Sequence, residues 1–322
     1  MPKRPSLEDQ LDRLSDLRDE PDRAVARQAL AKALASKASH LLPARAAKVA
    51  AVLGIDDLEQ EMAAAFDRLM VEPTKRDKGC VGKTALAKAL LDLGLDATGV
   101  FLAGIRHVQL EPVWGGSEDM AQELRAWCAQ GLARSGHPDS ILELVPLLVD
   151  PKRPPRLAAA RALGEVGRVE AEPLLRLKAL AGDEEPEVVG ECLASLLHLE
   201  PRRSLDFVGE FLHHRDAVLA EAAALALGES RLEGAVDLLA RRLEDTIVDP
   251  ELRRALFLGL AMSRRQSAFD LLLERVEDGG SAEASQALTA LALHRHDEAL
   301  NEKVEEILDG RNDRNLWKAY QS

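Results

Sequence analysis

Apolar residues recur every three to four positions along almost the whole chain, and this spacing predicts α-helices. The pattern is clear in KTALAKALLDLG, which begins at Lys83, and in AVLAEAAALALGES, which begins at Ala217. No segment alternates apolar with polar residues as a half-buried strand does, and no Asn-Gly or Asp-Gly turn joins two apolar runs. The pattern therefore predicts an all-α protein.

One arrangement of residues recurs with a period of about 32 residues. A turn rich in Asp, Glu and Pro precedes a helix made mostly of Ala and Leu, and a second helix follows. Equivalent positions are Gly131, Gly164, Leu196, Gly228, Leu260 and Leu291, which lie 33, 32, 32, 32 and 31 residues apart. Because one helix pair cannot cover its own apolar faces, this period predicts an α-solenoid of stacked helix pairs.

The period divides the chain into three expected parts. Residues 76–310 form the repeat array, residues 1–75 form an N-terminal helical cap, and residues 311–322 form a polar C-terminal cap. Within the N-terminal cap, the apolar spacing predicts four helices. They cover residues 7–17 and 22–36, a run that ends at residues 53 and 54, and residues 58–71.

Proline-led turns and the endings of the helices resemble those of HEAT repeats, particularly the short variety of the phycobilin lyases. Examples are PKRPPRLAAARALGEVG, which ends at Gly167, and EEPEVVGECLASLLHLE, which ends at Glu200. The resemblance covers roughly residues 76–310 and implies an α-α superhelix whose second helices line a concave, partner-binding face. It is specific for the fold and weak for function, because scaffolds, adaptors and some enzymes share this architecture.

The array carries one insertion, near residues 104–119. The equivalent glycines Gly94 and Gly131 lie 37 residues apart, which is about five residues more than the period. Trp and Arg are common at the centres of protein interfaces, and the insertion places a Trp on a Gly-Gly turn among polar residues. The candidate partner-binding residues are Arg106, His107, Gln109, Glu111, Trp114, Glu118 and Asp119.

Two interpretations of Trp114 stay open. Trp114 is an exposed anchor for a partner, or it fills a gap between two repeat units whose stacking the insertion disturbs. We favour the gap-filling interpretation.

A second candidate surface is a concentrated run of basic residues, in which Arg153, Arg156 and Arg161 share or adjoin one helix face. Such a face is a dock for an acidic partner, or it is an ordinary solvated face on which Arg161 pairs with Glu165 four residues later. We favour the solvated face.

Charge and aromatic content argue against nucleic acid and membrane partners. The formal net charge is −13, and residues 1–75 hold 12 basic and 13 acidic residues, so most of the acidity lies further along the chain. An acidic surface repels phosphate backbones and anionic lipids. Aromatic residues make up only 3% of the chain, which leaves few platforms for stacking nucleobases. We expect a protein partner and no nucleic acid or membrane.

We expect no catalytic residues, no metal and no cofactor. None of the eight histidines is followed by Glu, the pair that holds iron in the HEAT-like enzyme deoxyhypusine hydroxylase. The segment GCVGKT, which begins at Gly79, resembles a phosphate-binding loop, but Asp77 stands where that loop needs its first Gly. No strand precedes this segment, so we expect it to begin a repeat helix.

Three scattered cysteines, Cys80, Cys128 and Cys192, lie in apolar helical runs and are expected to be reduced core residues. Their odd number and the lack of a signal-like N-terminal run favour a cytoplasmic location. The sequence predicts a non-catalytic scaffold or adaptor. The alternatives are an enzyme or enzyme subunit resembling phycobilin lyases, and a protein resembling the HEAT-like DNA glycosylases.

Overall fold

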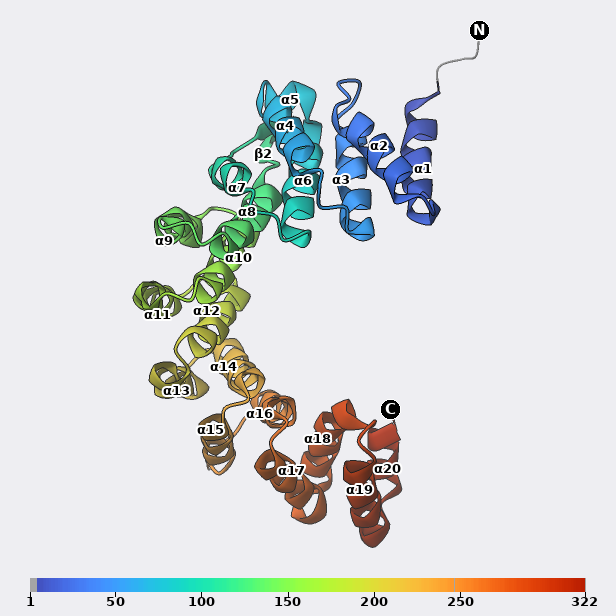
Figure 1. The fold of residues 1–322 in the computed structure, drawn as a ribbon. Coiled ribbons are helices and arrows are strands. Elements are labelled where there is room, and N and C mark those ends of the chain that lie inside the picture. The colour runs from blue at the N-terminus through green and yellow to red at the C-terminus, as the bar shows by residue number, and fades with distance from the viewer. Residues whose placement is uncertain (1–4, 246, 322) are drawn as a thin grey trace. The chain divides into compact units, whose positions relative to one another are not determined.

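The computed structural model describes residues 5–245 and 247–321, and nearly all regular structure in these ranges is helical (Figure 1). Consecutive helices stack as pairs, which confirms the predicted all-α solenoid. Contacts divide the chain into two compact units, Met1–Val166 and Gly167–Ser322, here called the first and second units.

The first unit contains ten helices and one β-hairpin within its described residues. The helices are α1 (Leu7–Asp16), α2 (Arg23–Leu34), α3 (Leu41–Leu53), α4 (Glu59–Met70), α5 (Pro73–Arg76), α6 (Val81–Asp92), α7 (Thr98–Ile105), α8 (Gln122–Arg134), α9 (Ser140–Leu144) and α10 (Arg153–Glu165). The strands are β1 (Leu110–Val113) and β2 (Gly116–Asp119).

Local signals account for the ends of the first helices. The Ser6 hydroxyl accepts a hydrogen bond from the Asp9 N–H at 3.0 Å, and the Asp9 carboxylate accepts one from the Ser6 N–H at 2.8 Å. Asp22 caps α2 with its carboxylate, and Gly54 ends α3 in the left-handed region with a φ of 63°. The four helices predicted before residue 72 are therefore confirmed, with small differences at their ends.

The second unit is a continuous stack of helices. They are α11 (Glu172–Ala181), α12 (Pro186–Leu199), α13 (Pro201–Glu210), α14 (Ala217–Ser230), α15 (Glu233–Leu243), α16 (Pro250–Ser263), α17 (Gln266–Asp278), α18 (Ser281–Leu291), α19 (Glu298–Arg311) and α20 (Arg314–Gln321). Three of them begin with a proline, where the missing N–H costs no helical hydrogen bond. The positions that define the period all fall near the ends of the Ala- and Leu-rich helices.

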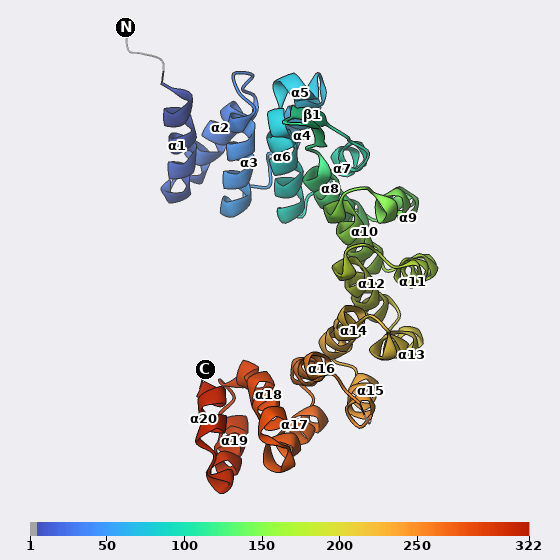
Figure 2. The same cartoon turned by 180° about the vertical axis from the view of Figure 1, so that it is seen from behind.

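Within the second unit the helices form two rows, α12, α14, α16 and α18 in one and α11, α13, α15 and α17 in the other (Figures 1 and 2). Small residues let the first row pack closely. A Cβ atom added to Gly228 of α14 would lie 2.5 Å from the Cα atom of Gly259 in α16, so the two backbones are in contact. Contacts between α13 and α15, or between α15 and α17, are much sparser.

A stack of helix pairs bends toward its more closely packed row, so the Ala- and Leu-rich first helices lie on the inner side of the second unit. We expected the second helices of the pairs to line the concave face, and this expectation is wrong for this unit. Alanine and glycine allow neighbouring backbones to approach, and those residues belong to the first helices.

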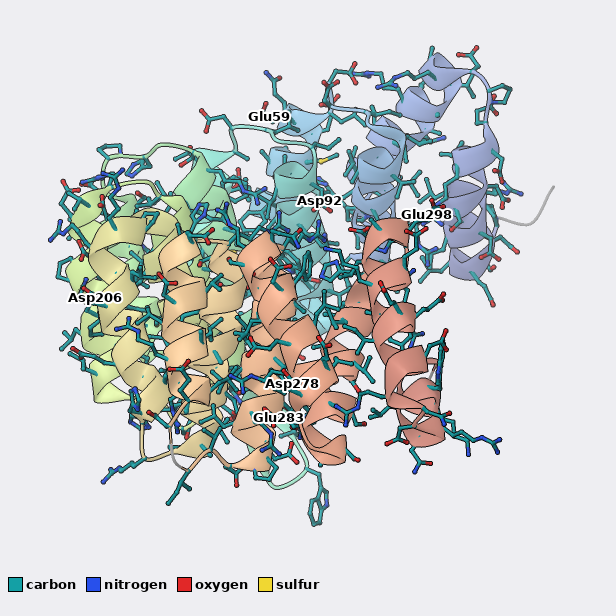
Figure 3. The ribbon with its side chains drawn as sticks, turned by 90° about the horizontal axis from the view of Figure 1, so that it is seen from below. Glu59, Asp92, Asp206, Asp278, Glu283 and Glu298 are labelled. Atoms are coloured by element: carbon teal, nitrogen blue, oxygen red, sulfur yellow. The ribbon has the colours of Figure 1, made fainter. Side chains whose placement is uncertain are left out.

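Several acidic side chains labelled in Figure 3 are exposed to solvent. Asp92 at the end of α6, Asp206 on α13 and Glu298 on α19 are all exposed. This placement is consistent with the acidic balance of the sequence.

Candidate functional site

The insertion folds as a β-hairpin. Strands β1 and β2 pair antiparallel, with Leu110 opposite Asp119 and Val113 opposite Gly116. Gly115 adopts a φ of 88°, a conformation that favours glycine, and so allows the chain to reverse in two residues. The apolar pattern predicted no strand anywhere in the chain, and this prediction is wrong for the insertion. The turn is Trp-Gly, which is not among the common hairpin signals, and the two strands are only four residues long.

Buried polar side chains fix one face of the hairpin to the turn before α6. The Glu111 carboxylate accepts a hydrogen bond from the backbone N–H of Gly79 at 2.7 Å. The Gln109 side-chain amide donates to the carbonyl of Asp77 at 2.8 Å and to the Glu111 carboxylate at 2.6 Å. Gln109 and Glu111 are only 1% and 5% exposed, so these bonds form away from water and hold the hairpin in one position.

The turn that receives the hairpin is organised by a buried ion pair. The Asp77 carboxylate lies 2.9 Å from the ammonium of Lys83, and both side chains are fully buried. Asp77 also accepts hydrogen bonds from the N–H groups of Gly82 and Lys83, at 2.7 and 2.9 Å, at the start of α6. The segment GCVGKT therefore begins a repeat helix, α6, as expected. Its lysine, Lys83, forms an ion pair with Asp77.

The other end of the hairpin is joined to α8. One Asp119 oxygen accepts hydrogen bonds from the N–H groups of Gln109 and Ala121, and the other lies 2.7 Å from the guanidinium of Arg125. Burial alone would raise the pKa of Asp119, but these hydrogen bonds and Arg125 outweigh it and hold the pKa below its ordinary value. Arg125 is itself buried and also pairs with Asp150 at 2.8 Å.

Two more predicted residues flank the hairpin. Arg106 is exposed and pairs with Glu143 of α9, with its Nε atom 2.7 Å from the carboxylate. The ring of His107 is partly buried and lies 3.2 Å from the side-chain oxygen of Gln109. Burial lowers the pKa of His107, although the contact with Gln109 opposes the shift.

Trp114 lies at the tip of the hairpin and is completely exposed, with a relative exposure of 103%. The interpretation of Trp114 as a gap-filling residue is therefore wrong. Three neighbouring apolar side chains are also exposed, Val108 at 58%, Leu110 at 59% and Val113 at 39%. These exposed apolar residues of the hairpin and the segment before it are called here the hairpin tip (Val108, Leu110, Val113 and Trp114).

The predicted residues thus divide into two groups. Gln109, Glu111 and Asp119 are buried and position the hairpin, whereas Trp114 and Glu118 face solvent. Sequence reasoning missed the residues that receive the hairpin, namely Asp77, Gly79, Lys83, Arg125 and Asp150. The repeat period was a possible signal for two of these residues. Asp77 lies 32 positions before Gln109 and Gly79 lies 32 positions before Glu111, and a hydrogen bond joins each pair.

The three arginines of the candidate basic patch do not share one exposed surface. Arg156 is 5% exposed and donates to the carbonyl of Asp150 at 3.0 Å. Arg153 and Arg161 are exposed and line a shallow groove of about 280 Å³ between α8 and α10, beside Trp127. Arg156 is therefore a structural residue, and Glu165 lies 3.4 Å from Arg134 of the neighbouring helix.

The described residues contain no group of three or more His, Cys, Asp or Glu side chains that could hold a metal ion. Cys80, Cys128 and Cys192 are free and buried. Burial raises the pKa of each thiol, to about 11 for Cys80 and to about 12 for Cys192. Within the same described ranges, every helix is too short or too polar to cross a lipid bilayer.

Each repeat is one helix pair, and successive pairs stack on one another, so the chain is a helical-repeat solenoid. A family model for HEAT repeats matches residues 116–177 and 173–249. The matched part of the chain, which includes helices α8–α15, therefore consists of HEAT repeats. No curated protein sequence matches the chain significantly.

Several solved structures are similar to the chain at low TM-scores. The complex of CpcE and CpcF of phycocyanin lyase from Nostoc sp. PCC7120 has 18% identity and a TM-score of 0.38, with 88% of this chain and 93% of that chain covered. Human deoxyhypusine hydroxylase in complex with glycerol has 17% identity and a TM-score of 0.34, with 88% and 98% covered. An engineered protein has 18% identity and a TM-score of 0.37, with 99% and 95% covered. We draw no functional argument from similarities at this level.

Proposed function

We propose that this protein is a non-catalytic scaffold or adaptor that binds a protein partner through the hairpin tip. The observation that carries the proposal is the complete exposure of Trp114 at the end of a hairpin whose other face is held by buried hydrogen bonds. An exposed Trp beside other exposed apolar residues is unfavourable in water and is typical of a binding surface. Trp is also among the residues that contribute most to protein interfaces.

The rigid attachment of the hairpin supports binding. Gln109, Glu111 and Asp119 already order the two strands in the free protein, so a partner would not have to order them. Less conformational entropy is then lost on association, and more of the contact energy appears as affinity.

The exposed residues also define the surface that the partner needs. The indole of Trp114 and the side chains of Leu110 and Val113 call for an apolar pocket, while Arg106 and Glu118 provide a polar rim. The inner helix row of the second unit, formed by α12, α14, α16 and α18, is the second partner-binding surface in this proposal. The resemblance to HEAT repeats implied that the second helices of the pairs form this binding face, and the inner row takes their place. This part of the proposal is supported by the solenoid fold alone.

The test compares the wild-type protein with Trp114→Ala and with Leu180→Ala, a control on α11 whose side chain is 69% exposed. Tagged proteins are used for affinity purification with quantitative mass spectrometry, and each captured protein is then titrated in purified form. We expect at least one partner whose affinity falls by about tenfold or more with Trp114→Ala, because Trp truncation at an interface centre costs about 2 kcal/mol or more. Leu180→Ala should leave the affinity unchanged. Retention of every direct partner by Trp114→Ala would overturn the proposal.

A further inference from the structure

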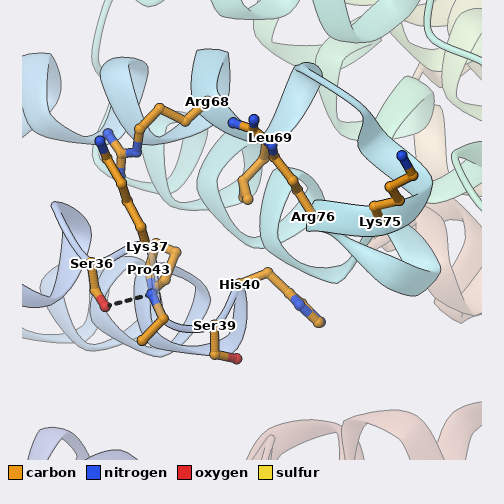
Figure 4. A pocket seen from close by; sticks show the side chains of 10 residues that line it. Ser36, Lys37, Ser39, His40, Pro43, Arg68, Leu69, Lys75 and Arg76 are labelled. Atoms are coloured by element: carbon orange, nitrogen blue, oxygen red, sulfur yellow. Dashed lines mark hydrogen bonds between the residues drawn. The ribbon is translucent and has the colours of Figure 1, made fainter.

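The first unit contains a basic pocket at one end of its helices, away from the hairpin in sequence. It has a volume of about 670 Å³ and lies between the turn that joins α2 to α3 and the end of α4 with the short helix α5 (Figure 4). Its lining includes Lys37, Arg68, Lys75 and Arg76, together with His40. This pocket is called here the basic pocket.

No carboxylate is among the described residues that line the basic pocket, although the chain as a whole carries a net charge of −13. The nearby acid Glu72 pairs with Lys75 at 2.7 Å and with Arg76 at 3.7 Å, so one carboxylate faces two cations there. Lys37 forms no hydrogen bond or ion pair with any described residue, and its side chain extends along the same side of the pocket as Arg68 (Figure 4). The basic pocket therefore concentrates positive charge that the protein itself does not neutralise.

Arg68 is held in place by hydrogen bonds to two backbone carbonyls, one within α4 and one at the end of α2. Its guanidinium donates to the carbonyl of Ala64 at 2.9 Å and to the carbonyl of Leu34, the last residue of α2. These bonds leave the long side chain ordered at the pocket wall. A positively charged group that is ordered in advance loses little conformational entropy when it binds an anion.

The opening turn of α3 adds to the positive potential. Ser39 orders this turn, because its hydroxyl accepts a hydrogen bond from the Leu41 N–H at 3.2 Å. The helix begins directly after His40 and runs for 13 residues, so its dipole places partial positive charge at this end, although the N–H groups of Leu41 and Leu42 are already hydrogen-bonded to Ser39.

We propose that the basic pocket binds a ligand through a phosphate group. Several cations around one pocket match the double negative charge and the multiple acceptor oxygens of a phosphate monoester better than a single carboxylate. The volume is larger than one phosphate needs, so the ligand is a phosphorylated organic molecule or a phosphorylated side chain. The shared phosphate group is what the pocket recognises. Binding also relieves repulsion among the basic side chains and so stabilises the folded first unit.

The test uses the full chain in isothermal titration with inorganic pyrophosphate, a phosphoserine peptide and the same peptide without phosphate, all at equal ionic strength. The pocket variant is Lys37→Gln/Lys75→Gln, in which both substituted side chains are exposed and only the exposed ion pair of Lys75 with Glu72 is lost. The matched control is Lys32→Gln/Lys48→Gln, which removes two exposed lysines from α2 and α3 outside the basic pocket.

We expect at least one phosphate-bearing probe to bind, with an affinity at least about tenfold weaker in the pocket variant and unchanged in the control variant. Tighter binding of pyrophosphate would identify a small molecule as the ligand source, and tighter binding of the phosphoserine peptide would identify a modified protein. Failure of both phosphate-bearing probes to bind, or equal weakening in both variants, would overturn the proposal. Trp114→Ala should leave this binding unchanged, so the outcome is separate from that of the partner-binding test.

Discussion

The carboxylate of Glu111 accepts a hydrogen bond from the backbone N–H of Gly79, and the two residues lie 32 positions apart. This bond joins the hairpin of the insertion to the turn before α6, one repeat earlier. The insertion that interrupts the repeat period is therefore held in one position as a projecting hairpin. The exposed Trp114 is therefore presented by an ordered element.

Replacing Glu111 tests the attachment of the hairpin. Glu111→Ala leaves the Gly79 N–H and the Gln109 amide without their buried acceptor, and we expect a loss of stability of about 1–3 kcal/mol. Hydrogen exchange of the hairpin amides should become faster. Glu118→Ala is the control, because Glu118 lies opposite Glu111 in the hairpin and is exposed, and its effect should stay within about 0.5 kcal/mol. Equal exchange rates in the two variants would contradict the role assigned to Glu111.

The buried pair of Asp77 and Lys83 gives a second prediction. Asp77→Asn removes the charge that compensates Lys83, and urea unfolding should show a loss of about 3–5 kcal/mol. The double variant Asp77→Asn/Lys83→Met should be more stable than Asp77→Asn alone, because no unpaired charge remains buried.

An exposed ion pair is the control for this comparison. Glu251 and Arg254 are 64% and 63% exposed, and Glu251→Gln should cost less than about 1 kcal/mol. If Asp77→Asn is no more costly than Glu251→Gln, the pair does not have the energetic role that its burial implies.

The contact between α14 and α16 predicts the effect of one methyl group. In Gly228→Ala the new Cβ atom would lie 2.2 Å from the carbonyl oxygen of Gly259, so the two helices must separate. We expect a loss of about 1–3 kcal/mol and a lower melting temperature. Gly310→Ala on α19 is the matched control, because no atom lies within 4 Å of its new Cβ atom. That variant should be unchanged or more stable by up to about 1 kcal/mol. A melting temperature for Gly228→Ala at or above that of Gly310→Ala would show that the helices do not approach as described.

The lowered pKa of His107 predicts that part of the folding stability is lost at acid pH. Burial holds its pKa below the ordinary value, so the unfolded chain takes up the proton first as the pH falls. Its contribution to stability is complete above the unfolded pKa of about 6.5 and is lost as the pH falls from there toward the lower folded pKa. The measurement is the urea midpoint at about pH 7.5 and about pH 5.5.

His107→Gln should reduce the difference between these two midpoints. The control variant is His198→Gln, which removes an exposed histidine of α12 and should leave the difference as in the wild type. The same pH dependence in wild type and His107→Gln would exclude His107 as its source.

Local patterns in the sequence determined the helices and their repetition. The spacing of apolar residues predicted helices at residues 7–17 and 58–71, close to the observed α1 and α4. The 32-residue period predicted stacked pairs, because the helix length and the turn residues repeat with it. Both signals arise within a few turns of helix, where neighbours in sequence are also neighbours in space.

Only the tertiary structure decided which residues of the insertion are accessible. Gln109, Glu111 and Trp114 lie within six residues of one another, yet the first two are buried and Trp114 is exposed. Their burial depends on contacts with Asp77 and Gly79, and the repeat separation of 32 residues does not by itself show that these contacts form. The basic pocket likewise depends on tertiary structure, because Lys37 and Arg68 come from different helix pairs. Helices follow from local periodicity, whereas a site depends on contacts between residues a full repeat apart.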